Sequence, residues 1–134
     1  MNMNLKNRVA IAAGTIALVW GSLASAAPPA SVTGTWSIVA NQNGSSLVLS
    51  QGAAGTPCKP INGTVFGNAV RGFYCPATGR IAFSRKNAAG VVIQTYIGNA
   101  SDAGTPNRMG GTFQPLDEAA SSGPLGEYHF QAQK

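Results

Sequence analysis

Beyond residue 33 the chain consists of short apolar segments separated by two or three turn-forming residues. The separators include Asn43-Gly44, Gly67-Asn68 and Ala88-Ala89-Gly90. Short strands joined by tight turns are typical of an antiparallel meander, and a meander of about eight strands usually closes into a barrel. After the first 27 residues no segment shows helical periodicity. The sequence therefore predicts an all-β fold, an eight-stranded antiparallel up-and-down β-barrel.

The first 27 residues have the organisation of a secretory signal peptide. Lys6 and Arg8 precede an apolar run that ends at Trp20, and small residues follow at Ala24-Ser25-Ala26, where signal peptidase would cut. The run is shorter than the about 20 apolar residues that span a bilayer. We therefore predict a bacterial Sec-type leader over residues 1–27 and a mature chain that is secreted or periplasmic, with no membrane association after cleavage.

The mature chain, residues 28–134, is one domain in length and supports a single hydrophobic core. Without the leader it retains 7 of the 9 basic residues and all 4 acidic residues, which leaves a net charge of +3. Its arginines, such as Arg71, Arg80 and Arg108, are dispersed along the chain. Because nucleic-acid binding needs clustered positive charge, this distribution argues against a nucleic-acid partner.

The two cysteines, Cys58 and Cys75, are predicted to form one structural disulfide, because thiols in exported proteins are usually oxidised. They lie at the open end of a hairpin that turns at Gly67-Asn68. That turn leaves Cys58 about two residues away from the position that faces Cys75, so we expect a bulge around residues 57–60 to bring the two together.

Turn chemistry also predicts which residues face the interior, because paired residues share a face of the sheet. A two-residue turn at Asn43-Gly44 pairs Ile38 with Leu49 and places both on the inner face. The Gly67-Asn68 turn pairs Ile61 with Tyr74. The last strand, residues 126–133, alternates with Tyr128, Phe130 and Ala132 on one face.

A loop at Ala88-Ala89-Gly90, ending in a left-handed glycine, joins strands near residues 79–87 and 91–98. It pairs Phe83 with Thr95 and Arg85 with Ile93, so that Arg85 points inward near an apolar barrel mouth. Glycines at 110 and 111 indicate a bend or bulge in a strand around residues 108–114. The predicted registers turn three aromatic side chains outward, and these could form a homo-oligomer interface: Phe66, Phe73 and Tyr96.

Thr33-Gly34-Thr35-Trp36, at the head of regularly spaced strands, resembles the first strand of avidins in the calycin superfamily. The resemblance covers residues 33–133 and implies an up-and-down barrel that holds a small ligand. The chain differs from avidins where they bind biotin, because Gly63-Thr64-Val65 replaces their Gly-Thr-Tyr and no tryptophan follows Trp36. The resemblance therefore implies the fold and a ligand-holding role without biotin.

No group of residues predicts catalysis. The single histidine, His129, lies on the polar face of the last strand, and Asp117 and Glu118 lie in a loop, where charged side chains are usually solvated. The chain also lacks the spaced histidine, cysteine or carboxylate ligands of a metal site. We therefore predict that the protein is not an enzyme and has neither a metal nor another cofactor.

The predicted function is the binding of a small ligand at one barrel mouth. An arginine that faces an apolar mouth needs a ligand oxygen or a carboxylate to offset the loss of its hydration. The alternative is a disulfide-stabilised protein-binding module with a filled interior, such as an inhibitor of a secreted hydrolase. The residues predicted to bind the ligand are Trp36, Tyr74, Phe83, Arg85 and Phe113.

Overall fold

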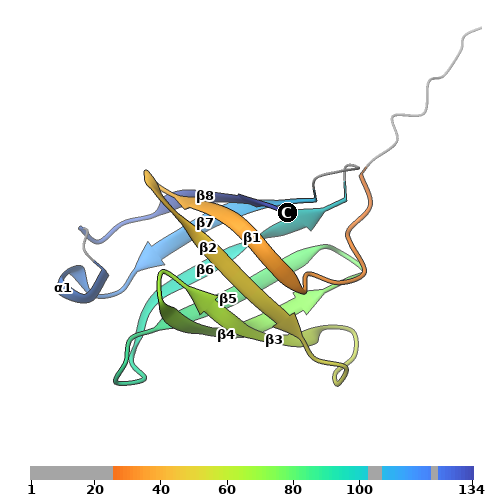
Figure 1. Cartoon of the computed structure of the whole chain (residues 1–134), viewed down its shortest axis with the longest axis horizontal. Coiled ribbons are helices and arrows are strands. Elements are labelled where there is room, and N and C mark those ends of the chain that lie inside the picture. The colour runs from red at the N-terminus through yellow and green to blue at the C-terminus, as the bar shows by residue number, and fades with distance from the viewer. Residues whose placement is uncertain (1–25, 103–106, 122–123) are drawn as a thin grey trace, which may run out of the picture.

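A computed structural model describes residues 26–102, 107–121 and 124–134 of the protein (Figure 1). Residues 1–25 of the predicted signal peptide lie outside the described residues. In the described part, eight antiparallel strands form a closed barrel in which each strand pairs with its sequence neighbours and β1 pairs with β8. The predicted fold class is confirmed. The strands are β1 (Gly34–Ala40), β2 (Asn43–Gln51), β3 (Lys59–Val65), β4 (Asn68–Cys75), β5 (Arg80–Lys86), β6 (Val92–Ser101), β7 (Arg108–Pro115) and β8 (Tyr128–Gln133).

Helix is confined, in the described residues, to the single turn α1 (Glu118–Ser121), between β7 and β8. The sequence analysis predicted a loop here, since one turn is too short to create a helical periodicity. No helix in this part of the chain is long and apolar enough to cross a membrane.

In β1 and β2 the predicted faces are confirmed, but the predicted turn is wrong. Trp36, Ile38 and Leu49 are buried as expected. The strands turn at residues 41–42, and Trp36 pairs with Leu47. Asn41 has a φ of 55°, and its backbone N–H donates to the carbonyl of His129 in β8 at 2.8 Å. The register therefore differs from the prediction by an even number of residues, which leaves every side chain on its predicted face.

The β3–β4 hairpin also turns earlier than predicted, by one position, at Phe66 and Gly67, and this shifts its register by two residues. Both residues have positive φ, 49° and 73°, as a type I′ turn requires. In this register Cys58 lies directly opposite Cys75, and the predicted disulfide forms with a Cα–Cα distance of 4.1 Å. The predicted bulge before β3 is wrong, because the earlier turn removes the offset that it was meant to absorb.

The β5–β6 hairpin has the predicted loop, with Gly90 at a φ of 80°. A register shift between Arg85 and Lys86, however, places an extra residue in β6. Phe83 consequently pairs with Tyr96, whereas the sequence analysis paired it with Thr95. A shift of one residue exchanges the two faces of a strand, so Tyr96 points into the barrel and Ile97 points out.

The prediction that three aromatic side chains face outward is right for one of them. Phe73 is 43% exposed, but Tyr96 is only 1% exposed because of the β5–β6 register. Phe66 lies in the β3–β4 turn and packs against the core. The apolar residues that do face outward here are Phe73 and Ile97, which lie on either side of Ala82 across β4, β5 and β6.

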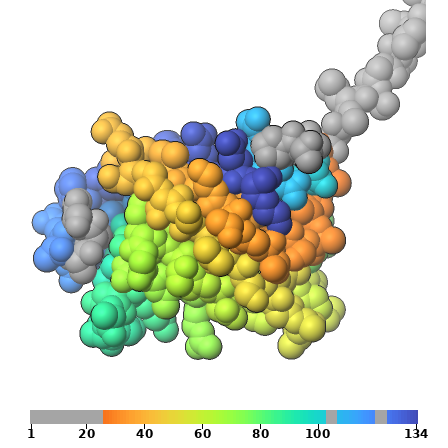
Figure 2. Space-filling model, in the orientation of Figure 1, coloured from red at the N-terminus to blue at the C-terminus, as the bar shows by residue number. Residues whose placement is uncertain are grey.

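Residues 26–33, here called the lead-in, lie across one end of the barrel, the lead-in end. Figure 2 shows the first described residues, in orange, at the right-hand side of the molecule. The side chain of Val32 is fully buried, and its carbonyl accepts a hydrogen bond from Trp36 Nε1 at 2.8 Å. The Tyr74 hydroxyl donates to the carbonyl of Pro29. The lead-in therefore closes this end with apolar contacts and hydrogen bonds.

The glycines of β6 and β7 permit the strands to approach each other closely. Gly98 pairs with Gly111, and a Cβ at Gly111 would lie 2.1 Å from the carbonyl oxygen of Ile97. Phe130 pairs with Gly111 from the other side. Pairing continues through residues 110–111 without a register shift, so the bulge predicted here is wrong, and the missing side chains provide space beside Phe130.

The disulfide is expected to stabilise the barrel by restricting the unfolded chain. Its sequence separation of 17 residues corresponds to about 3 kcal/mol of loop-closure entropy. Replacing both cysteines by alanine should lower the free energy of unfolding by about that amount in urea denaturation. An unchanged free energy in the double variant would show that the bridge adds no stability.

The hydrogen bond from Tyr74 to the lead-in is expected to stabilise the fold as well. Tyr74→Phe leaves the buried contacts of the ring in place and removes only the hydroxyl that donates to Pro29. The free energy of unfolding should fall by about 1 kcal/mol in urea denaturation. The matched control is Tyr128→Phe, whose hydroxyl donates to Pro124 at an exposed site. Equal effects of the two substitutions would contradict a specific role for the lead-in contact.

Candidate ligand cavity at the turn end

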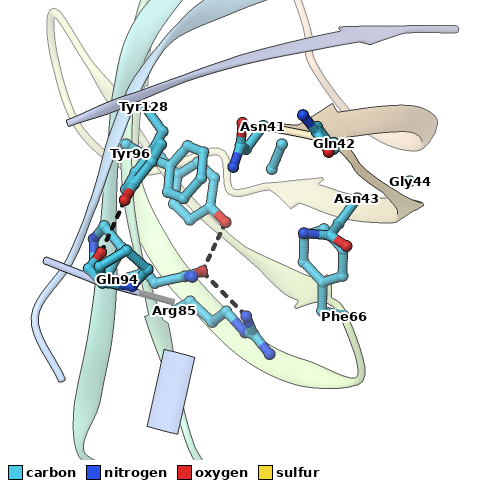
Figure 3. A pocket seen from close by; sticks show the side chains of 13 residues that line it. Asn41, Gln42, Asn43, Gly44, Phe66, Arg85, Gln94, Tyr96 and Tyr128 are labelled. Atoms are coloured by element: carbon cyan, nitrogen blue, oxygen red, sulfur yellow. Dashed lines mark hydrogen bonds between the residues drawn. The ribbon is translucent and has the colours of Figure 1, made fainter. Parts of the chain in front are cut away.

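The barrel end opposite the lead-in, the turn end, contains the β1–β2, β3–β4, β5–β6 and β7–β8 connections. A cavity of about 560 Å³ opens there between the turns (Figure 3). It is lined by aromatic rings, prolines, amide side chains and one cation. These residues are Ala40, Asn41, Gln42, Asn43, Gly44, Phe66, Arg85, Gln94, Tyr96, Phe113, Pro115, Pro124 and Tyr128.

One wall is a row of four aromatic side chains on consecutive strands. Phe83 of β5 pairs with Tyr96 of β6, which pairs with Phe113 of β7, which pairs with Tyr128 of β8. The ring centroids are 4.7 Å, 5.1 Å and 5.5 Å apart, and the first two pairs are stacked. Equivalent inward positions on neighbouring strands thus form a continuous row of rings, and three of the four residues, all except Phe83, line the cavity.

The interior behind this wall is filled. Phe130 meets Tyr96 edge-on at a centroid distance of 5.4 Å and meets Phe83 edge-on at 6.3 Å. Both arrangements are favourable for aromatic rings. Phe83 and Phe130 are buried and do not line the cavity. The cavity is therefore a recess at the mouth of a packed barrel.

Arg85, at the end of β5, is held by neutral groups. Its Nε donates to Asn68 Oδ1 at 2.9 Å and its Nη1 donates to Gln94 Oε1 at 3.1 Å. Its Cζ lies 5.1 Å from the centroid of the Phe66 ring, a cation–π distance. Partial burial lowers the pKa of Arg85, since desolvation disfavours the charged form. Arginine nevertheless remains protonated at neutral pH, so the cavity contains a positive charge.

Gln94 connects this cation to the aromatic wall. Its Oε1 accepts a second hydrogen bond, at 2.8 Å, from the hydroxyl of Tyr96. Burial raises the pKa of Tyr96 to about 12, while the nearby charge of Arg85 acts in the opposite direction. Tyr96 is therefore neutral and donates to Gln94 over the physiological pH range. One amide oxygen thus orients both Arg85 and Tyr96 (Figure 3).

The β1–β2 turn contributes the polar part of the rim. Asn41, Gln42 and Asn43 are exposed and line the cavity across from Tyr96 and Tyr128 (Figure 3). Their amides can donate and accept hydrogen bonds. The position of this turn follows from the hydrogen bond of Asn41 to β8, so the rim depends on barrel closure.

The structure divides the five predicted ligand-binding residues between the two barrel ends. Arg85 and Phe113 line the turn-end cavity, and Phe83 stacks behind Tyr96. Trp36 and Tyr74 bond to the lead-in at the other end. The prediction that all five share one mouth is therefore wrong, because alternation along a strand shows which face a residue occupies but not how far along the barrel it lies.

Several cavity residues were missed by the sequence analysis. Tyr96 was assigned to the outside because the β5–β6 bulge was not anticipated, and Gln94 was missed for the same reason. Phe66 was placed on the outer face of a strand, whereas it lies in a turn at the rim. The inward position of Tyr128 was predicted from the alternation in the last strand, which could have added this residue to the site.

The described residues contain no group of three or more histidine, cysteine or acidic side chains that could hold a metal ion. His129 is exposed on β8, as its position on the polar face predicted. The absence of catalytic function stays a prediction.

The sequence matches no protein-family model and no curated protein. The resemblance to avidins consequently stays a prediction, and the function has to be argued from the cavity.

The raised pKa of Tyr96 makes the stability of the barrel depend on pH in alkaline solution. Because the folded pKa of about 12 exceeds the value of 10.0 in an unperturbed tyrosine, this stabilisation is complete below pH 10 and is lost as pH rises toward 12. The melting temperature of the wild type should therefore fall more steeply above pH 10 than that of Tyr96→Phe. Parallel pH profiles for the two proteins would contradict the raised pKa.

Proposed function

We propose that this is a non-enzymatic, exported binding protein that holds a small organic ligand in the turn-end cavity. The observation that carries the proposal is an open recess whose wall is aromatic and whose one charged lining residue, within the described chain, is Arg85. The disulfide fits export, because such bridges persist in oxidising compartments.

The size and lining of the cavity support this function. Ligand sites are typically recesses of about 300–1,000 Å³ with apolar walls and a few polar groups that orient the ligand. The volume of about 560 Å³ falls in that range. Tyr96, Phe113 and Tyr128 provide apolar ring edges, and Gln94 and Arg85 provide the polar groups. A planar molecule of one or two rings suits this combination.

The filled interior agrees with the alternative, a protein-binding module, whereas the cavity at the mouth favours the ligand hypothesis. A purely structural barrel would have no need for a recess of this size at its mouth, bordered by a cation and amide side chains that a ligand could reach. Tyr96 and Phe113 also belong to the hydrophobic core, and Tyr128 packs against it, so the same rings stabilise the barrel and border the cavity. Recognition of a partner protein by the loops remains the competing outcome of the test below.

Binding should be measured with the purified protein against a set of small aromatic compounds by ligand-observed NMR and calorimetry. We expect saturable binding with one site per chain. Phe113→Leu keeps most of the side-chain volume and removes the flat ring, so it should weaken binding about fivefold. The control is Phe73→Leu on the exposed outer surface, which should leave affinity unchanged. Absence of saturable binding by the wild type, or equal losses in both variants, would refute the proposed site.

A further inference from the structure

We propose that the cavity selects ligands that carry a single negative charge, specifically a carboxylate attached to a flat aromatic body, and that Arg85 is the residue that selects them. This inference rests on the proposed function and names the class of ligand. It depends on three observations: the free hydrogen-bonding capacity of Arg85, the charge of the cavity and the position of the aromatic wall.

The guanidinium of Arg85 has hydrogen-bond donors that no group of the described residues accepts. A guanidinium carries five N–H groups. Two of them are used, by Asn68 and Gln94, and no other protein acceptor is recorded for Arg85 in the described part of the chain. Three N–H groups are thus available, and Arg85 lines the cavity. Neighbouring N–H groups of arginine match the spacing of two carboxylate oxygens, which favours a bidentate pair.

The positive charge of Arg85 has no opposing charge among the residues that line the cavity. Apart from Arg85, the lining residues in the described chain are neutral. A partly desolvated cation without a carboxylate is costly, and an anionic ligand offsets that cost. One cation matches one negative charge, so a carboxylate fits better than a phosphate ester with two charges.

The aromatic wall begins where the anion would sit. Gln94 Oε1 bonds to both Arg85 and the hydroxyl of Tyr96, so these two side chains converge on one atom. From Tyr96 the rings of Phe113 and Tyr128 continue along the wall. A ligand whose carboxylate meets Arg85 can therefore place a ring system against the edges of these rings, with the amides of the β1–β2 turn beside it (Figure 3).

A purely structural role for Arg85 is the competing explanation. Asn68 lies on β4 and Gln94 on β6, so the side chain connects three strands. That role uses two of the five N–H groups and gains nothing from the three that remain. The two explanations differ in what they predict for charged and neutral ligands of the same shape.

The test compares 2-naphthoate with 2-naphthamide, which have the same rings and differ in charge, by titration calorimetry at low ionic strength. The wild type should bind the carboxylate at least about tenfold more tightly than the amide. Arg85→Gln should remove this preference, so that the two compounds bind with similar affinity. Arg85→Lys keeps the positive charge but loses the paired N–H donors of the guanidinium, so it should retain part of the preference. The matched control is Arg71→Gln, on the exposed outer surface of β4, which should behave as the wild type.

The outcomes separate this inference from the proposed function. If both compounds bind the wild type with equal affinity, the cavity binds ligands but the selection of an anion is refuted. A carboxylate preference that survives in both Arg85 variants also refutes it. Tighter binding of 2-naphthyl phosphate than of 2-naphthoate would refute the carboxylate class. If no aromatic compound binds at all, the proposed function fails and this inference fails with it.

Discussion

Closure of the barrel between β1 and β8 is the constraint on which the rest of the structure depends. The pairing of Ile38 with Ala132 and of Ala40 with Phe130 joins the first strand to the last. The hydrogen bond from Asn41 to His129 extends this contact into the β1–β2 turn. Closure converts the inner faces of eight short strands into one interior and brings the β1–β2 turn opposite the aromatic row of β5 to β8. Without closure neither the core nor the rim of the cavity would exist.

The two barrel ends have different physical characters. At the lead-in end, Trp36 and Tyr74 use their polar atoms to hold the lead-in, so their polar groups are satisfied within the protein. At the turn end, Arg85 has only neutral partners and three aromatic residues line the cavity. The lead-in thus covers the closed end, and the proposed ligand site lies at the open one. The packed rings of Phe83 and Phe130 separate the two.

A single extra residue in β6 determines the character of the cavity. The register shift beside Arg85 turns Tyr96 inward and sets Gln94 opposite Arg85. The candidate site depends on both of these changes, because Gln94 orients the guanidinium of Arg85 and Tyr96 extends the aromatic row. Without the bulge the faces of β6 would be exchanged, and the side chain of Thr95 would replace that of Tyr96 opposite Phe83. The strand register in this part of the barrel therefore decides which residues line the candidate site.

The sequence by itself determined the all-β class, the strand positions to within a few residues, the disulfide and the inward faces of β1 to β4 and β8. These features follow from local rules, since alternation and turn residues act over a few positions. A register error of an even number of residues also leaves every side chain on its predicted face. Only the tertiary structure decided the registers, the bulge that places Tyr96 and Gln94 in the cavity, and the separation of Trp36 and Tyr74 from Arg85 and Phe113. The reason is physical: the distance along a barrel, and the strand that receives an extra residue, depend on how all eight strands fit together when the sheet closes.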